Sequence, residues 1–166
     1  MGTDKALLEV DGVPLARRVA DALRAAGADP VIAVGGDLDA LDALGLTAVP
    51  DVPPGEGPLG GILSALAATD DEVVVILACD LPAADAATIR AVALALAEAD
   101  VAAPWHDGRH ELLHAAYSRR AEPVLQAAFA AGERAPQRAV ADLAVVGVEG
   151  LPAAALTDAD TPDDLP

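Results

Sequence analysis

The stretch EVVVILACD, residues 72–80, contains an unbroken run of apolar, mainly β-branched residues from Val73 to Cys79. An apolar run of this kind predicts a strand that is covered on both faces, as strands of parallel sheets are. Asp80 then places a carboxylate directly after the strand, at the end where parallel sheets bind their ligands. The stretch therefore predicts a central strand together with a candidate site.

Strand and helix patterns alternate on both sides of this stretch, with short connections. The pattern predicts an α/β fold, a three-layer Rossmann-like arrangement with a mostly parallel sheet, formed by residues 1–166 as one domain. The predicted helices cover residues 13–27, 37–45, 62–69, 84–100 and 119–132, with another beginning at 161; the predicted strands cover 30–36, 46–50, 72–80, 101–105, 110–118 and 143–150.

Charge and composition exclude several classes of partner. The chain has 27 acidic and 10 basic residues, a net charge of −17, and shows no basic patch, so neither nucleic acid nor an anionic membrane is an expected partner. No apolar run reaches the ~18 residues of a membrane span, and there is no export signal. The single cysteine, Cys79, cannot form an internal disulfide, which favours the cytoplasm, and its apolar neighbours predict an inert core thiol.

The segment GEGPLG, residues 55–60, has the glycine spacing of a dinucleotide-binding loop. Two prolines, Pro53 and Pro54, separate it from the preceding strand, and Pro58 removes a backbone N–H that should bind pyrophosphate. These prolines disfavour a dinucleotide site. Two interpretations stay open: a loop that lets a flat polar ligand approach the backbone, or a tight turn before a helix.

Several polar residues are candidates for chemistry. Asp80 suits Mg²⁺, which takes one or two protein carboxylates, although it could instead cap the next helix, for which Asp85 is better placed. Asp160, in DADTPDDL, could supply a second carboxylate, although Thr161 and Pro162 make this segment a good helix start.

The basic and histidine residues are sparse. Lys5 is the only lysine beside nine arginines, which suits phosphate binding by a compact ammonium group. The spacing of His106, His110 and His114 resembles ligand spacing on a helix, but Gly108 interrupts that helix and disfavours zinc.

Taken in order, five segments resemble the molybdenum cofactor guanylyltransferases. They are MGTDKALLEVDGVPLARRV (1–19), PDVPPGEGPLGGILSAL (50–66), VVVILACDLP (73–82), AAGERA (130–135) and DADTPDDL (158–165). The resemblance extends over nearly the whole chain, and GPLGGI together with ACDLP at this spacing is fairly specific.

The resemblance implies a nucleotidyltransferase that joins GTP to molybdopterin, the organic part of molybdenum cofactor, with Mg²⁺ bound and pyrophosphate released. Further partners would be molybdenum cofactor insertion proteins or molybdoenzymes, in transient contact. Carried over by position, Lys5 and Asp80 would be catalytic, Asp80 and Asp160 would hold Mg²⁺, and the nucleotide would contact Lys5, Asp51, Gly57, Pro58, Leu59, Gly60 and Gly61.

Some positions depart from the family pattern. The family begins with a strand and a glycine-rich phosphate loop ahead of the position of Met1, so we expect this chain to be the later part of a longer protein. Asp158 and Asp160 replace asparagines, and DGRHELLHAAY lacks a usual His-Pro pair. The alternatives are another nucleotidyltransferase of the same fold, of cytidylyl or sugar-phosphate type, or a binding module without catalysis.

Overall fold

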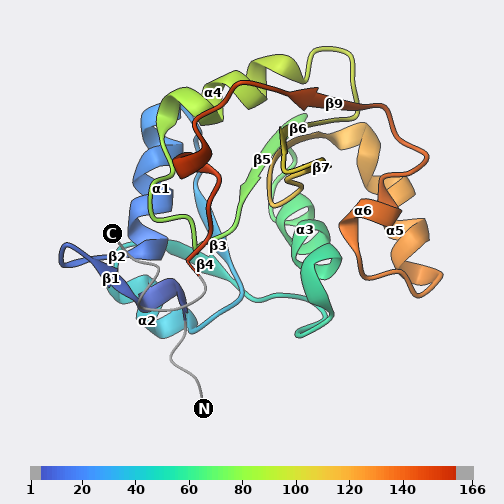
Figure 1. The fold of residues 1–166 in the computed structure, drawn as a ribbon. Coiled ribbons are helices and arrows are strands. Elements are labelled where there is room, and N and C mark those ends of the chain that lie inside the picture. Colours follow the sequence, from blue (N-terminus) through green and yellow to red (C-terminus); the bar gives the residue numbers. More distant parts are fainter. Residues whose placement is uncertain (1–4, 160–166) are drawn as a thin grey trace.

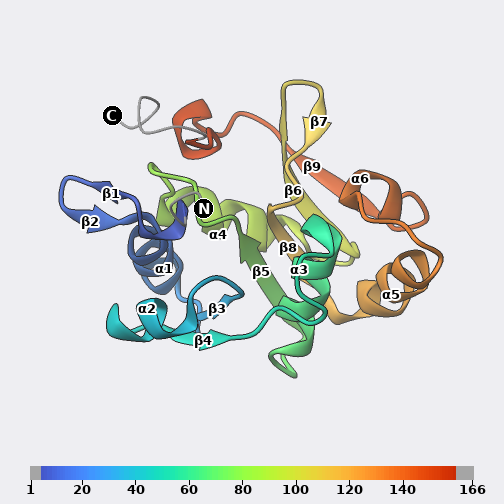
Figure 2. The ribbon, with the colours of Figure 1, turned by 90° about the horizontal axis from the view of Figure 1, so that it is seen from below.

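A computed structural model describes residues 5–159, in which strands lie between two layers of helices (Figure 1, Figure 2). Helices α1 (Leu15–Ala26) and α4 (Ala86–Ala95) pack together on one face of the strands. Helices α3 (Gly57–Ala67) and α5 (Glu122–Ala130) pack together on the other. This arrangement confirms the predicted α/β class and its three layers.

The amino-terminal part builds a small parallel pair of strands. After η1 (Lys5–Leu7), the hairpin of β1 (Glu9–Val10) and β2 (Val13–Pro14) turns at Asp11 and Gly12 and leads into α1. Strands β3 (Ile32–Val34) and β4 (Thr47–Val49) then pair in parallel, connected by α2 (Leu38–Ala43).

The second sheet is mixed. Its strands are β5 (Val73–Leu77), β8 (His114–Ser118), β6 (Val101–His106) and β9 (Val145–Val148), in that order, with β7 (Arg109–His110) folded back on the end of β6. β8 runs antiparallel to both β5 and β6, whereas β9 is parallel to β6. The expectation of a mostly parallel sheet is therefore not met here, because residues 107–113 are fewer than the dozen or so that a parallel crossover needs.

Alternating residues of this sheet form two separate cores. Ala102 and Ala116 pack with Val92 of α4 and with Leu96, the C-cap residue of that helix. Their neighbours in sequence point to the opposite face, as the pleat requires. There the core contains Leu59, Ile62 and Leu66 of α3, Leu125 of α5, and Val101, Ala115 and Tyr117 of the sheet. The remaining short helices are η2 (Arg119–Ala121), α6 (Pro136–Ala139) and η3 (Ala153–Ala155), and no helix within residues 5–159 is both long and apolar enough to cross a bilayer.

Strand β5 differs from its prediction. Its apolar run is only partly covered: Val73 is 48% exposed and the other four residues are partly buried. The ladders among residues 5–159 pair β5 only with β8, and β3 only with β4. The edge of β5 opposite β8 therefore has no paired neighbour within the described part of the chain. Apart from the β1–β2 hairpin, the described strands form two sheets instead of one.

Strand β8 places a histidine in the core. His114 is 2% exposed, and neither ring nitrogen has a hydrogen-bond partner among the described residues. Burial lowers the pKa of His114 to about 4, although the nearby Asp85 carboxylate acts in the opposite direction. The ring is therefore neutral in the folded protein at neutral pH.

We expect His114 to make the protein less stable in mild acid. Because its folded-state pKa of about 4 lies below the ordinary 6.5, the unfolded chain binds a proton that the folded chain does not. This part of the stability is present above pH 6.5 and is lost as the pH falls toward 4. Between pH 7 and pH 5, His114→Leu should lose about 2 kcal/mol less unfolding free energy than the parent, since a shift of one pKa unit corresponds to about 1.4 kcal/mol.

Urea unfolding of both proteins at the two pH values measures this difference. All other titrating groups are shared, so their contributions cancel in the comparison. Equal losses in the two proteins would show that His114 does not titrate as its burial implies.

Candidate functional site

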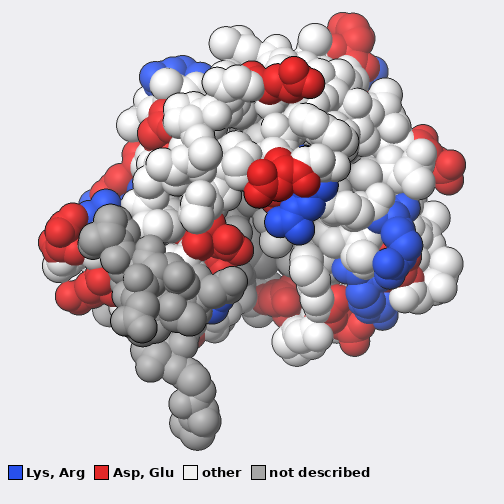
Figure 3. Space-filling model, viewed as in Figure 1, with Lys and Arg blue, Asp and Glu red and all other residues white. Residues whose placement is uncertain are grey.

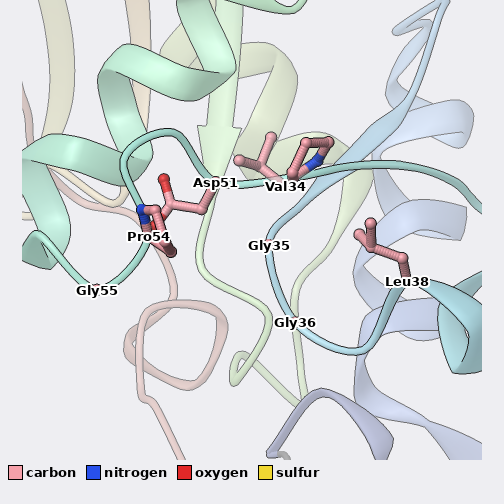
Figure 4. Close-up of a pocket in the computed structure, with 8 residues that line it drawn as sticks. Val34, Gly35, Gly36, Leu38, Asp51, Pro54 and Gly55 are labelled. Atoms are coloured by element: carbon pink, nitrogen blue, oxygen red, sulfur yellow. The ribbon is translucent and has the colours of Figure 1, made fainter.

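Polar or glycine residues follow the carboxyl ends of β3, β4 and β5. Gly35 and Gly36 follow β3, Asp51 follows β4, and Asp80 follows β5. The first two loops line a cavity of about 430 Å³ and face each other across it (Figure 4). The carboxyl ends of parallel strands are the usual place for a ligand in an α/β fold. The cavity lies in that place, and its lining residues are Val34, Gly35, Gly36, Leu38, Pro50, Asp51, Pro54 and Gly55.

The glycine pair after β3 brings its backbone close to the β4 loop. Gly35 has a φ of 74°, and a Cβ added to it would lie 3.3 Å from the Cβ of Asp51. A side chain at this position would therefore be strained and crowded. Neither Gly35 nor Gly36 was among the predicted site residues, although a glycine pair directly after a strand is a recognisable signal for close backbone approach.

Asp51 is held by a serine from α3. The Ser64 hydroxyl donates to Oδ1 of Asp51 at 2.7 Å and accepts from the backbone N–H of Val52 at 3.0 Å. Ser64 is only 8% exposed, one of few polar side chains buried in the described residues. The contact fixes the carboxylate at the rim of the cavity. In the sequence, this contact is indicated only by Ser64 itself, a polar residue on the buried face of an apolar helix.

The segment 57–61, expected to contact the nucleotide, is the first part of α3. The helix begins at Gly57, not at residue 62 as predicted, with Pro58 in its first turn. Gly57 and Pro58 are exposed, whereas Leu59 is fully buried and its N–H donates to the carbonyl oxygen of Arg134 at 3.3 Å. Contacts between Leu59 and a nucleotide would therefore need a change in this structure. The nucleotide-binding role of Gly57, Pro58, Leu59, Gly60 and Gly61 stays a prediction.

A charged brace secures the start of α3. Nε of Arg134 lies 2.6 Å from Oε2 of Glu56, and its guanidinium lies 3.9 Å above the centre of the Phe129 ring. The next acid, Glu133, accepts hydrogen bonds from the Arg138 side chain and from two backbone N–H groups, which lowers its pKa to about 2. The AAGERA segment thus positions the helix start that the sequence connects with nucleotide binding.

Lys5 and Asp80 meet beside the end of β5. Nζ of Lys5 lies 3.8 Å from Oδ2 of Asp80, and the two side chains are 41% and 22% exposed. Asp80 is not the cap of α4, because Asp85 accepts the N–H groups of Ala87 and Thr88 at 2.8 and 3.0 Å. The structure therefore brings together two of the predicted site residues.

The other predicted metal ligand cannot be placed. Asp160 lies outside the described residues, although the preceding N–H, of Ala159, donates to the carbonyl oxygen of Asp80 at 2.8 Å. Among residues 5–159, no three histidine, cysteine, aspartate or glutamate side chains cluster as metal ligands. A single carboxylate at Asp80 fits Mg²⁺, which completes its shell with water and phosphate oxygens.

The structure also tests the expectations for the three histidines and for Cys79. The histidines at 106, 110 and 114 lie on β6, β7 and β8, not on one helix. Cys79 is exposed, so the prediction of a core thiol is wrong. It follows β5, whose edge opposite β8 is not paired within the described residues, so the apolar sequence around it is not matched by burial.

Positive charge is neutralised locally. On the face shown in Figure 3, blue atoms lie in small groups beside red ones. Eight of the nine arginines form ion pairs with carboxylates, for example Arg17 with Asp21 and Arg138 with Glu133. These pairs keep the arginines close to acidic groups of the same chain.

The comparisons with known proteins agree on one family. A model of the MobA-like NTP transferase domain matches residues 1–146. A molybdenum cofactor guanylyltransferase of Pseudomonas putida (strain GB-1) is 36% identical over 150 residues, which cover 89% of this chain and 78% of the relative. A probable molybdenum cofactor guanylyltransferase of Natronomonas pharaonis is 31% identical, covering 98% of this chain and 86% of the relative.

Solved structures support the fold. Molybdopterin-guanine dinucleotide biosynthesis protein A from Archaeoglobus fulgidus matches with a TM-score of 0.74 and 24% identity, covering 98% of this chain and 87% of that one. The 2-C-methyl-D-erythritol 4-phosphate cytidylyltransferase of Thermus thermophilus matches with a TM-score of 0.76 and 19% identity, covering 96% and 89%. At these identities the likeness shows the fold alone.

Two adjacent glycines of α3 give a test of the brace. A Cβ at Gly60 would lie 3.2 Å from the Cβ of Glu56 and 3.7 Å from the Phe129 ring, whereas a Cβ at Gly61 meets nothing within 4 Å. Gly61→Ala should therefore stabilise the protein by ~0.5–1 kcal/mol through helix propensity. Gly60→Ala should lose this gain, because Glu56 must move away from Arg134. Urea unfolding of the two variants measures the difference, and equal stabilisation would mean that the helix start is not tightly held.

Proposed function

The chain belongs to the MobA-like NTP transferase family, and from this premise we propose that it transfers GMP from GTP to molybdopterin and releases pyrophosphate. The observation that carries the proposal is the approach of Lys5 to Asp80 after the end of β5. One cationic and one anionic side chain at this edge suit a reaction between phosphate groups. The relatives named as molybdenum cofactor guanylyltransferases support the choice of substrates.

Lys5 is suited to bind the triphosphate. Its ammonium group is 41% exposed, and the 3.8 Å separation from Asp80 is longer than a hydrogen bond. A partly exposed ion pair of this kind contributes about 1 kcal/mol or less, so exchanging this one contact for phosphate oxygens costs little. A compact ammonium on a flexible stem suits such a change of partner.

Asp80 is the residue that would hold Mg²⁺, with Asp160 as a second candidate. When bound, Mg²⁺ supplies positive charge to the phosphate oxygens and makes the α-phosphorus more reactive. A phosphate oxygen of molybdopterin forms a bond to the α-phosphorus of GTP, and the bond to the leaving pyrophosphate breaks. No protein nucleophile is needed, so this chain contributes by positioning the two substrates and by neutralising charge.

The nucleoside is proposed to bind in the cavity between Gly35 and Asp51. Two glycines with positive φ leave the backbone open on one side, and the carboxylate held by Ser64 lies on the other. Flat, polar groups can approach a backbone that carries no side chains. The exposed start of α3, at Gly57, offers further backbone groups to guanine.

A cytidylyltransferase is the second candidate. The solved cytidylyltransferase of Thermus thermophilus shares the fold with a TM-score of 0.76, as closely as the Archaeoglobus fulgidus protein does. The fold therefore does not distinguish a guanine nucleotide from a cytosine nucleotide as the substrate. The GPLGGI sequence and the curated relatives favour guanine.

Nucleotide preference tests the choice between these two candidates. The product of the complete reading frame that contains this chain should bind GTP with Mg²⁺ at least about tenfold more tightly than CTP, UTP or ATP, equivalent to about 1.4 kcal/mol. Calorimetric titration with each nucleotide measures this. Equal or tighter binding of CTP would replace the guanylyltransferase proposal with the cytidylyltransferase one.

Asp80→Asn tests the metal role. The substitution keeps the shape of the side chain but removes its charge, so GMP transfer at saturating GTP should fall on the order of 10²–10⁴-fold. Asp70→Asn, at an exposed position before β5, is the matched control and should leave transfer unchanged. Melting temperatures of both variants should stay near that of the parent. Full transfer by Asp80→Asn at saturating Mg²⁺ would remove Asp80 from the proposed site.

A further inference from the structure

A tight turn presents the single tryptophan of the chain on a hairpin. β6 and β7 are joined by Asp107 and Gly108, whose φ values of 49° and 78° suit the turns of two-residue hairpins. The turn pairs Trp105 with His110 across the two strands. Figure 2 shows this hairpin extending beyond the other strands of its sheet. We refer to residues 105–110 as the tryptophan hairpin.

Trp105 is the aromatic side chain that is most open to solvent. The chain has one tryptophan, one tyrosine and one phenylalanine. Tyr117 is fully buried and Phe129 lies under the guanidinium of Arg134, whereas Trp105 is 42% exposed. An indole ring that is partly exposed can stack against a flat ligand.

The position of the indole ring is set by its neighbours. The His110 ring packs edge-to-face against it, with 4.7 Å between the ring centres and 70° between their planes. In β9, a Cβ added to Gly147 would lie 3.3 Å from the Cβ of Trp105 and 3.2 Å from Cε1 of His110. The φ of Gly147 is not positive, so this close packing explains why a glycine stands there. A ring that is held in advance loses little freedom when a ligand binds.

The tryptophan hairpin lies at the same edge of the sheet as Asp80. β8 runs antiparallel to both β5 and β6, so β5 and β6 run in the same direction and their carboxyl ends share one edge. Asp80 follows β5, and Trp105 lies near the end of β6. The two strands are separated by β8 alone, which corresponds to roughly 10 Å at the usual spacing of strands.

A carboxy-terminal segment connects the two places. In the tryptophan hairpin, a hydrogen bond to Glu111 and, to a smaller extent, the charge of Asp158 raise the pKa of Arg109. The next residue, Ala159, donates its N–H to the carbonyl oxygen of Asp80 at 2.8 Å. Residues 158–159 therefore contact the Asp80 segment and come near the tryptophan hairpin.

We propose that Trp105 stacks against the flat pterin ring of the acceptor substrate, so that the tryptophan hairpin forms the acceptor side of the site. The identity of this acceptor rests on the proposed function. Stacking of a flat heteroaromatic ring on an aromatic side chain is a common way to bind it without reading its sequence of polar groups. The ring of molybdopterin and the base of GTP are both flat, so their positions have to be told apart.

The order of the strands assigns the two rings to different sides. In Figure 1 and Figure 2, β5 lies between β3 and β6. The nucleoside is proposed to bind between Gly35 and Asp51, on the β3 side, with its phosphates at Lys5 and Asp80. Both substrates must be bound together for the reaction, so the β6 side is left to the acceptor. A pterin ring held there leaves the phosphate of the acceptor free to reach the α-phosphorus.

Pterin fluorescence tests the contact directly. An indole stacked on an excited pterin quenches its emission, and the pterin can be excited where tryptophan does not absorb. When 6-hydroxymethylpterin is titrated with the product of the complete reading frame that contains this chain, its emission should fall. Trp105→Ala should abolish this quenching.

Equilibrium dialysis of the same pterin measures affinity in variants that lack the quencher. Trp105→Ala should bind it about tenfold more weakly than the parent, equivalent to about 1.4 kcal/mol, whereas Trp105→Phe keeps a flat ring and should lose at most about threefold. Leu94→Ala removes another exposed apolar side chain, on α4, and is the matched control with unchanged affinity. Melting temperatures of all three variants should stay within a few degrees of the parent.

GTP provides the control for the ligand. Trp105→Ala should bind GTP with Mg²⁺ as the parent does. In transfer assays it should raise KM for molybdopterin about tenfold and leave KM for GTP unchanged, because only acceptor binding is weakened.

Three results would overturn the inference: emission that the parent does not quench, equal pterin affinity of the parent and Trp105→Ala, or a loss of GTP affinity in Trp105→Ala. The last would make Trp105 part of the nucleotide site. Tighter binding of CTP than of GTP would contradict the proposed function instead, and quenching of the pterin by Trp105 would still support the inference.

Discussion

The structure depends on how α3 crosses from one sheet to the other. No ladder within residues 5–159 joins β3 to β5, so the contacts of α3 must align the two sheets on their shared face. Leu59, Ile62 and Leu66 anchor the helix in the core of the second sheet, while Ser64 binds the loop after β4. Burial of each large apolar side chain contributes roughly 1.5–3 kcal/mol, so the helix is firmly attached to the second sheet. A hydrogen bond from Ser64 then holds the Asp51 loop to that helix. The packing of α3 therefore sets the position of Asp51 in the candidate site.

Features that depend on local chemistry could be predicted from the sequence. The end of α1 at Gly27 follows from a glycine that adopts a φ of 101°, and the start of α4 follows from Asp85, whose side chain accepts two backbone N–H groups. Each involves residues within one turn of each other. The position of Asp80 could be predicted for another reason, since an acid that follows an apolar strand marks the carboxyl edge of a sheet.

Features that depend on distant partners were predicted less well. The direction of β8 is set by its short connection to β6, although its own sequence looks like any buried strand. Gly57 and Pro58 resemble helix breakers, yet a proline is accepted in a first turn and the Glu56–Arg134 pair secures that turn from 78 positions along the chain. Burial of β5 and Cys79 depends on what lies at the edge of β5 opposite β8, which the apolar pattern of β5 alone does not specify. Sequence patterns identify which surfaces are apolar enough to be buried. Only the folded structure shows which of them are in fact buried.

The local pairing of arginines has a consequence for how an anionic substrate arrives. With 27 acidic and 10 basic residues, and with eight arginines already next to carboxylates, the long-range field of the molecule is negative. A bare nucleoside triphosphate is repelled once it comes within about a Debye length, roughly 8 Å at physiological ionic strength, because salt screens the field beyond that distance. A triphosphate that travels with a divalent cation carries less charge and meets a smaller barrier to encounter. If the proposed nucleotide is the substrate, the surface of this chain would favour its metal-bound form at encounter.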